Sequence, residues 1–341
     1  MRDKETIFFR ADMNEVIATG HMMRCLSIAR TAKRLGINAF FIISDNNAVD
    51  LLDKYSMQYS VIDVEWDKPE NEIEKLINLI REKNIKNIVI DKYEITEKYL
   101  HDVSKETKVW YIDDIKKFKY PVYGIINYTV GAEKFSGEKV YSLGKNLLLG
   151  SKYSPLRESF EKYAEPRKIK SKIKELLILS GGGNETFLVE KLMDYFVEYD
   201  ELHITTICGR LCENVDALRE KYKGIEIYQN VDDIENYMLR ADLAISAGGS
   251  TVYELCACGT PSMIYSVADN QMGNVNELIN QKAAIYIGDV RYDDLKSNIS
   301  DALITLNNPK ARQELSKKMQ ELVDGKGAER IVRKILFQSK S

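Results

Sequence analysis

Residues 242–271, DLAISAGGSTVYELCACGTPSMIYSVADNQ, predict a strand, a glycine turn, a short helix, a second strand and a polar loop. The apolar run at 243–245 suits a buried parallel strand, and the glycines at 248–249 permit a tight turn that exposes backbone amides. Ser250 and Thr251 then begin the predicted helix. Because a helix N-terminus offers unpaired N–H groups and the positive end of a dipole, we expect a phosphate or diphosphate site here.

Glu254, one turn into this predicted helix, has two interpretations. Thr251 and Glu254 have the spacing of a capping box, which explains both residues without any ligand. If a diphosphate occupies the helix N-terminus, the Glu254 carboxylate is instead placed to accept hydrogen bonds from a ribose diol, as acidic residues do in dinucleotide sites. The spacing alone leaves both interpretations open.

The composition indicates an ordinary globular chain that binds a small molecule. It has 341 residues, 44% hydrophobic and 30% charged, with a net charge of −3. The length predicts two domains, and the charge balance indicates neither disorder nor a nucleic-acid footprint. No apolar run approaches the roughly 20 residues of a membrane span, and the N-terminus lacks a signal-peptide pattern. We therefore expect a cytoplasmic monomer without a membrane span.

Five cysteines are an odd number for a disulfide framework and predict reduced, buried thiols. Cys256 and Cys258 have no second cysteine or histidine cluster nearby, so we expect no metal site.

β-rich runs alternate with amphipathic stretches along the chain, which predicts an α/β protein with doubly wound parallel sheets. The runs are at 7–9, 38–44, 59–64, 87–91, 108–114 and 123–128, and then at 174–180, 201–208, 224–230, 242–246, 261–266 and 284–288. Between the two series, residues 144–173 are charged, lack strand periodicity and are interpreted as a crossover. The predicted domains are 1–155 and 156–341, two Rossmann-like halves that imply a cleft.

A predicted helix at 20–35 follows the first strand and places His21 in an exposed first turn. The helix dipole should keep the imidazole neutral and competent as a base near pH 7. Alternatively, His21 is a structural residue bonded to a neighbouring loop. Polar residues follow several predicted strands, where they either cap the chain or orient His21: Asp12, Asp91, Asp113 and Asp114.

Five segments, spread from about residue 6 to 290, together resemble the PseG/SpsG family. They are GHMMRC (20–25), VIDKY (89–93), LLLGSKYSPLR (147–157), ISAGGSTVYEL (245–255) and ADNQ (268–271). This family is similar in fold to MurG-type glycosyltransferases. The resemblance therefore implies a GT-B fold, with two Rossmann-like domains and a nucleotide-sugar cleft between them.

The resemblance also implies residue roles. The catalytic base falls on His21, and Glu254 is favoured as a ribose ligand. The implied nucleotide-binding residues are Gly181, Gly182, Ser246, Ala247, Gly248, Gly249, Ser250, Thr251 and Glu254. The implied sugar-side residues are Arg10, Asp12, Gly20, Arg24, Tyr93, Asn270 and Gln271.

Two positions depart from the family pattern. Ala18 stands where the family usually has glycine, which alters the loop if that position needs a positive φ. Asn184 stands at a usually acidic position. Neither change alters the expected fold or the expected nucleotide. Both changes affect which sugar the site would accept.

PseG hydrolyses a UDP-linked diacetamido-trideoxy-altrose in pseudaminic acid biosynthesis. By resemblance, we expect this chain to release UDP from a UDP-linked diacetamido-trideoxy hexose by inverting water attack at the anomeric carbon, without a metal or cofactor. One alternative is a GT-B glycosyltransferase in which His21 deprotonates an acceptor hydroxyl, and a second is a non-catalytic nucleotide-sugar-binding protein. The sequence also leaves open whether the nucleotide is UDP, GDP or CMP.

Overall fold

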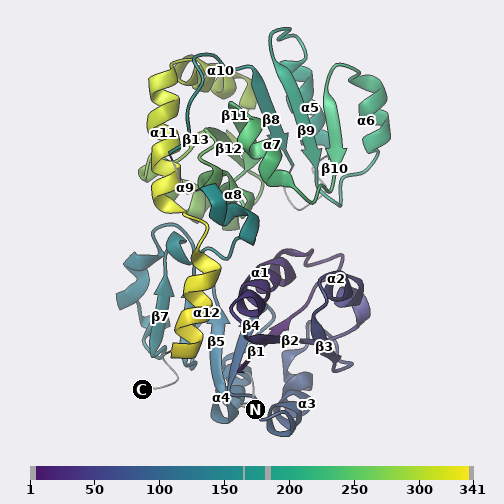
Figure 1. Ribbon diagram of the computed structural model, residues 1–341, viewed down its shortest axis with the longest axis vertical. Helices are drawn as coiled ribbons and strands as arrows, with labels where there is room; N and C mark the ends of the chain where they lie inside the picture. Colours follow the sequence, from purple (N-terminus) through teal and green to yellow (C-terminus); the bar gives the residue numbers. More distant parts are fainter. Residues whose placement is uncertain (1–4, 164–165, 181–185, 338–341) are drawn as a thin grey trace. The chain divides into compact units, whose positions relative to one another are not determined.

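The computed structural model describes residues 5–163, 166–180 and 186–337. The chain divides into two compact units, Ser159–Gly325 and a first unit formed by Met1–Glu158 with Lys326–Ser341. Both are α/β, as predicted, and both sheets are parallel throughout. Figure 1 shows the helices and strands of each unit.

The first unit has a seven-stranded sheet in the order β3-β2-β1-β4-β5-β6-β7. Its strands are β1 (Thr6–Ala11), β2 (Asn38–Ile43), β3 (Gln58–Val61), β4 (Asn87–Asp91), β5 (Lys108–Ile112), β6 (Gly124–Asn127) and β7 (Asn146–Leu149). Its α-helices are α1 (Gly20–Arg34), α2 (Val49–Lys54), α3 (Pro69–Glu82), α4 (Glu97–Glu106) and α12 (Gly327–Phe337). The strand order reverses between β1 and β4, and ligands of doubly wound sheets bind beyond the carboxyl ends of the strands at such a point.

The second unit has a sheet of six strands, the number that the sequence predicted. Their order is β10-β9-β8-β11-β12-β13. Its strands are β8 (Glu175–Leu179), β9 (His203–Cys208), β10 (Glu226–Gln229), β11 (Leu243–Ala247), β12 (Ser262–Ser266) and β13 (Ile285–Asp289). Its α-helices are α5 (Thr186–Phe196), α6 (Val215–Lys221), α7 (Ile234–Arg240), α8 (Thr251–Cys258), α9 (Met272–Asn280), α10 (Leu295–Leu306) and α11 (Pro309–Leu322). Here the order reverses between β8 and β11.

Two features differ from the sequence prediction. The predicted crossover at 144–173 contains β7, whose short Leu-rich run pairs with β6 and was too brief to show a strand period. The C-terminal helix α12 was assigned to the second domain, 156–341, but packs against α1 in the first unit (Figure 1). The start of α12 also lies close to the backbone of Ser154. This explains why the helix begins with a glycine, because a Cβ on Gly327 would lie 2.1 Å from the Ser154 carbonyl oxygen.

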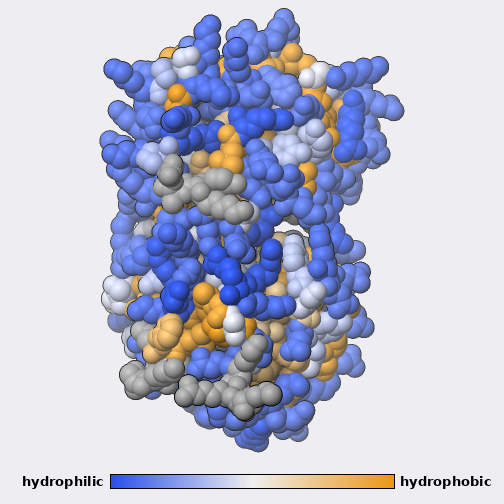
Figure 2. Space-filling view, in the orientation of Figure 1, coloured by the Kyte–Doolittle hydropathy of each residue, from blue (hydrophilic) through white to orange (hydrophobic). Residues whose placement is uncertain are grey.

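Apolar side chains from both faces of each sheet form the cores, and the cysteines belong to them. All five cysteines lie in the described part of the chain; each is buried, and none forms a disulfide. The face seen in Figure 2 is mostly hydrophilic, with hydrophobic residues in small groups. Among the described residues, no helix is long and apolar enough to cross a membrane.

Candidate active site

His21 lies at the carboxyl edge of the first sheet, as the second residue of α1. The helix begins there because the backbone N–H of Met23 donates to the Thr19 carbonyl and closes the first turn. The residue is only 5% exposed, so the prediction of an exposed first turn is wrong. The neighbouring strand end accounts for this burial, since Asp91 closes β4 directly against the imidazole.

Asp91 holds one nitrogen of the His21 ring. Its Oδ1 lies 2.7 Å from His21 Nδ1, and the carboxylate is fully buried. Arg24 Nη2 lies 2.9 Å from the same ring nitrogen, so Nδ1 faces both an acceptor and a donor. The shorter contact with a carboxylate, which can only accept, favours a proton on Nδ1 and an unprotonated Nε2 in the neutral imidazole. A histidine oriented by a carboxylate in this way presents Nε2 as a base.

Arg24, one turn further along α1, clamps the same carboxylate. Its Nε and Nη2 donate to the two oxygens of Asp91 at 2.5 and 2.7 Å. Burial alone would raise the pKa of Asp91, but the charge of Arg24, followed by that of His21, holds it below its ordinary value. Asp91 therefore stays ionised beside His21.

Tyr93, two residues after the end of β4, packs against the imidazole of His21. Its ring meets the His21 ring edge-on, with centroids 4.5 Å apart. Its hydroxyl donates to Asp114 Oδ2 at 2.9 Å, and Arg24 Nη1 reaches the same oxygen at 3.1 Å. Burial raises the pKa of Tyr93, so the hydroxyl keeps its proton. The structure thus brings together three predicted site residues from two segments of the chain.

Arg10 and Asp12 belong to a different, buried network. The Arg10 guanidinium pairs with Glu72 of α3 and with Asp12, and it also donates to the Ser44 hydroxyl. Lys92 Nζ reaches the same Glu72 carboxylate at 3.1 Å. Arg10 has no exposed surface, so the prediction that it contacts a sugar is wrong, and Asp12 has its two oxygens engaged by Ser44. Two cations, Arg10 and Lys92, thus face two acids, Asp12 and Glu72, so the buried network is balanced in charge.

The loop before His21 is strained at Ala18. Its φ is +52°, in the left-handed region that costs a residue with a Cβ about 1 to 2 kcal/mol. The position therefore does have a positive φ, a point that the sequence comparison with glycine left open. Asn14 Oδ1 accepts from the backbone N–H groups of Val16 and Ile17 and holds the loop in this shape. Gly20 follows with open space around its Cα.

In the second unit, the predicted glycine turn joins β11 to α8. Gly248 is required by packing, because a Cβ there would lie 2.4 Å from Val275 Cγ2. Gly249 has open space, with Gln271 Nε2 the nearest atom to its missing Cβ at 3.8 Å. The backbone N–H groups of Val252 and Tyr253 donate to the carbonyls of Gly249 and Ser250 and close the first turn of α8, and a helix N-terminus of this kind can bind anions. Ser246 and Ala247, the last two residues of β11, are buried and directly precede the turn.

The capping-box interpretation of Glu254 does not match the helix start. The N-cap of α8 is Ser250, which forms no side-chain cap hydrogen bond, and Thr251 is already inside the helix. A capping box would need Thr251 as the N-cap. Glu254 is half-buried in the first turn. A capping box with Thr251 as the N-cap therefore does not account for Glu254.

The ADNQ loop borders this turn. Gln271 accepts from the Val267 backbone N–H at 3.0 Å, and Asn274 donates to the Gly248 carbonyl at 3.2 Å. Tyr253 of α8 donates to Asn274 Oδ1 at 2.7 Å, which ties the two helices together. These contacts hold the loop against the turn. Asn270 lies in the short helical turn Asp269–Gln271, and its side chain is outside the described part.

Gly181 and Gly182, predicted to bind nucleotide, lie outside the described residues, as does Asn184. Within residues 5–163, 166–180 and 186–337, no group of three or more histidine, cysteine or acidic side chains is arranged to hold a metal.

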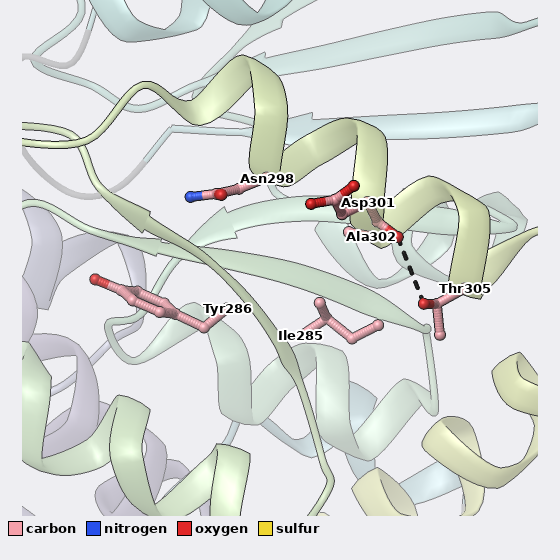
Figure 3. A pocket seen from close by; sticks show the side chains of 6 residues that line it. All are labelled: Ile285, Tyr286, Asn298, Asp301, Ala302 and Thr305. Atoms are coloured by element: carbon pink, nitrogen blue, oxygen red, sulfur yellow. Dashed lines mark hydrogen bonds between the residues drawn. The ribbon is translucent and has the colours of Figure 1, made fainter.

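A separate hollow of about 240 Å³ lies along the edge strand β13 and helix α10. Figure 3 shows its lining, which contributes one acid, Asp301, and no cation. Because a diphosphate needs donors or positive charge, this hollow is a poor nucleotide site, and no predicted site residue lines it.

Comparison with known proteins identifies the second half of the chain. Residues 162–333 match the model of the glycosyltransferase family 28 C-terminal domain. The chain belongs to this family. The match spans the β11–α8 turn and the ADNQ loop.

The resemblance to the PseG/SpsG family is confirmed by the spore coat polysaccharide biosynthesis protein SpsG of Bacillus subtilis, 24% identical over 324 residues and 92% of each chain. In structure, the chain is similar to MurG of Acinetobacter baumannii, with a TM-score of 0.69, 14% identity and coverage of 97% and 99%. It is also similar to a UDP-GlcNAc 2-epimerase from Neisseria meningitidis bound to UDP-GlcNAc, with a TM-score of 0.68, 10% identity and coverage of 98% and 100%. These neighbours confirm the GT-B fold.

Sequence reasoning placed Asp91 and Asp114 at strand ends and left open whether they cap the chain or orient His21, and it did not identify Tyr128. Tyr128 follows β6, and its hydroxyl accepts a hydrogen bond from Arg24 Nη1 at 2.8 Å. The available signal was position, because all three residues come at the carboxyl ends of neighbouring parallel strands.

Proposed function

We propose that this protein is a nucleotide-sugar hydrolase that releases UDP from a UDP-linked diacetamido-trideoxy hexose. The observation that carries the proposal is the pair formed by His21 and the fully buried Asp91, with Nδ1 held at 2.7 Å. A base of this kind has no use in a protein that only binds a nucleotide sugar.

In the proposed reaction, Nε2 of His21 takes a proton from water as the water attacks the anomeric carbon. Asp91 keeps the ring in the required tautomer and stabilises the imidazolium that forms. The bond between the anomeric carbon and the diphosphate oxygen breaks, and the sugar leaves with inverted configuration. Proton NMR of the nascent sugar tests this, because retention would require a carboxylate nucleophile.

UDP is proposed to be held by the second unit. The amides at the start of α8 offer hydrogen bonds and a positive dipole end to the diphosphate, and they stabilise the charge that develops on it as the bond breaks. Glu254 is proposed to accept hydrogen bonds from the ribose hydroxyls. The proposed residues at the turn are Ser246, Ala247, Gly248, Gly249, Ser250 and Thr251, with Asn270 and Gln271 on the sugar side.

The second candidate is a glycosyltransferase, favoured by the family 28 match and by the MurG-like fold. In that reaction His21 would deprotonate an acceptor hydroxyl instead of water. The name of the relative SpsG places that protein in spore coat polysaccharide biosynthesis, a process that either activity could serve.

Release of UDP from candidate nucleotide sugars, with and without an added acceptor, separates the two activities. The hydrolase proposal predicts stoichiometric UDP and free sugar with no acceptor present. UDP release that requires an acceptor would establish the transferase and contradict the proposal. Parallel assays with GDP- and CMP-linked sugars test the choice of nucleotide.

A further inference from the structure

Two acids in succession follow β5, and the structure uses them differently. Asp113 accepts four hydrogen bonds, from the backbone N–H groups of Ile115 and Lys116 and from the hydroxyls of Tyr120 and Tyr141. These contacts fold the loop that follows the strand. Asp113 is therefore a structural acid whose oxygens are fully engaged.

Asp114 instead faces the His21 cluster, the group of side chains formed by His21, Arg24, Asp91, Tyr93 and Tyr128. Its Oδ2 accepts from Tyr93 and from Arg24, whereas its Oδ1 is buried without a hydrogen-bond partner among the described residues. A buried carboxylate oxygen that lacks a donor costs free energy and is not explained by loop structure. A functional role of the Asp114 carboxylate would offset this free-energy cost.

The charges of the side chains around His21 indicate what the Asp114 carboxylate does. With a neutral imidazole, the cluster has one cation, Arg24, and two carboxylates, Asp91 and Asp114, so its net charge is −1. Protonation of His21 makes the cluster neutral. Since Arg24 can balance only one of the two acids, Asp114 leaves the negative charge of Asp91 available to the imidazolium.

The other groups around His21 do not change this count. Tyr93 and Tyr128 have pKa values raised first by burial, and so does the Cys25 thiol, so all three stay neutral. Lys92, next to Asp91 in sequence, points to Glu72 in the balanced network of Arg10 and Asp12. Asp113 faces Tyr120 and Tyr141.

We propose that Asp114 is a positioning residue that sets the proton affinity of His21 by balancing the charge of Arg24. This inference rests on the proposed function for its catalytic consequence but not for its effect on the titration of His21. Asp114 acts through Arg24 and Asp91 and need not touch the substrate.

The test is the variant Asp114→Asn, which keeps an oxygen that accepts from Arg24 and Tyr93 and removes the charge. NMR titration of the histidines in the protein without substrate reads the effect directly. The chain has three histidines, and the exposed His101 and His203 serve as internal references. We expect the His21 midpoint to move to lower pH by about one unit, as for loss of a nearby charge of opposite sign. The reference midpoints should not move.

The kinetic readout is the pH profile of UDP release. We expect the acidic limb of kcat/KM to move to lower pH with the NMR midpoint, while KM at high pH stays within about twofold. Glu74→Gln, which removes a carboxylate from the exposed face of α3 and contacts none of the three histidines, is the matched control and should move neither readout.

Two results would overturn the inference. An unshifted His21 midpoint in a folded Asp114→Asn variant would show that Arg24 does not transmit the charge. A raised KM with an unchanged pH profile would make Asp114 a direct contact of the sugar. If UDP release is absent in the parent, the proposed function fails, but the NMR midpoint still decides the role of Asp114.

Discussion

The first unit gathers charged side chains where its strand order reverses, whereas the second unit has small residues and backbone amides at the equivalent place. At the end of β4 lie the buried, ionised Asp91 and its cation Arg24, whose side chain is 13% exposed. Beyond β11 lie two glycines and the start of α8. Buried charges can set the proton affinity of a base, while backbone amides bind an anion without a titrating group. The same strand order therefore supports proton transfer in one unit and anion binding in the other.

The largest expected difference is in stability. Asp91→Ala leaves Arg24 buried beside Asp114 alone, and loss of one partner of a buried ion pair costs about 3 to 5 kcal/mol. Urea unfolding followed by circular dichroism, which reports on the helices of both units, measures it. Glu254→Ala, at the half-buried helix start of the second unit, is the matched control and should cost less than about 1 kcal/mol. Equal costs would contradict the comparison.

Acid should unfold the first unit before the second. Burial would raise the pKa values of Asp12, Glu72 and Asp91, but Arg10 and Arg24 hold them below their ordinary values of 3.8 and 4.5. Each contributes stability that is complete above the unfolded pKa and is lost as pH falls through the folded pKa. Hydrogen exchange measured from pH 6 down to pH 3 should therefore show residues 5–158 losing protection first. Earlier loss in residues 166–325 would count against this account.

Glu254→Ala should affect binding in the second unit only. Loss of charge-assisted hydrogen bonds to a ribose diol should weaken UDP binding by about 1 to 3 kcal/mol. Calorimetry with UDP measures the effect, and Glu314→Ala on α11 is a control of the same charge in the same unit. Unchanged affinity in a folded variant would remove the ribose assignment.

The smallest expected effect is at Ala18. Glycine removes about 1 to 2 kcal/mol of left-handed strain but adds about 0.4 to 1 kcal/mol of unfolded-state entropy. We therefore expect Ala18→Gly to stabilise the first unit by about 1 kcal/mol or less, seen as a higher urea midpoint with an unchanged slope. A lower midpoint would show that the loop contacts of Asn14, and not backbone strain, dominate there.

The sequence predicted local structure better than the partners of buried charges. The alternation of strands and helices gave both parallel sheets, and two glycines before Ser250 gave the α8 turn. The family resemblance assigned Arg10 to the sugar, yet its partner Glu72 is 62 residues away on α3. Asp91 and His21 are 70 residues apart, and strand-end position was the one local signal that linked them. Pairings of this kind depend on tertiary packing, which periodicity does not report.

The central claim is that His21 acts on the reacting water and takes no part in holding UDP. The most direct test is the rate of UDP release by His21→Asn, measured at saturating UDP-sugar together with UDP affinity by calorimetry. Loss of a general base should lower turnover by roughly 10²- to 10⁴-fold and leave UDP affinity within about twofold. A folded variant that releases UDP at close to the parental rate would contradict the account.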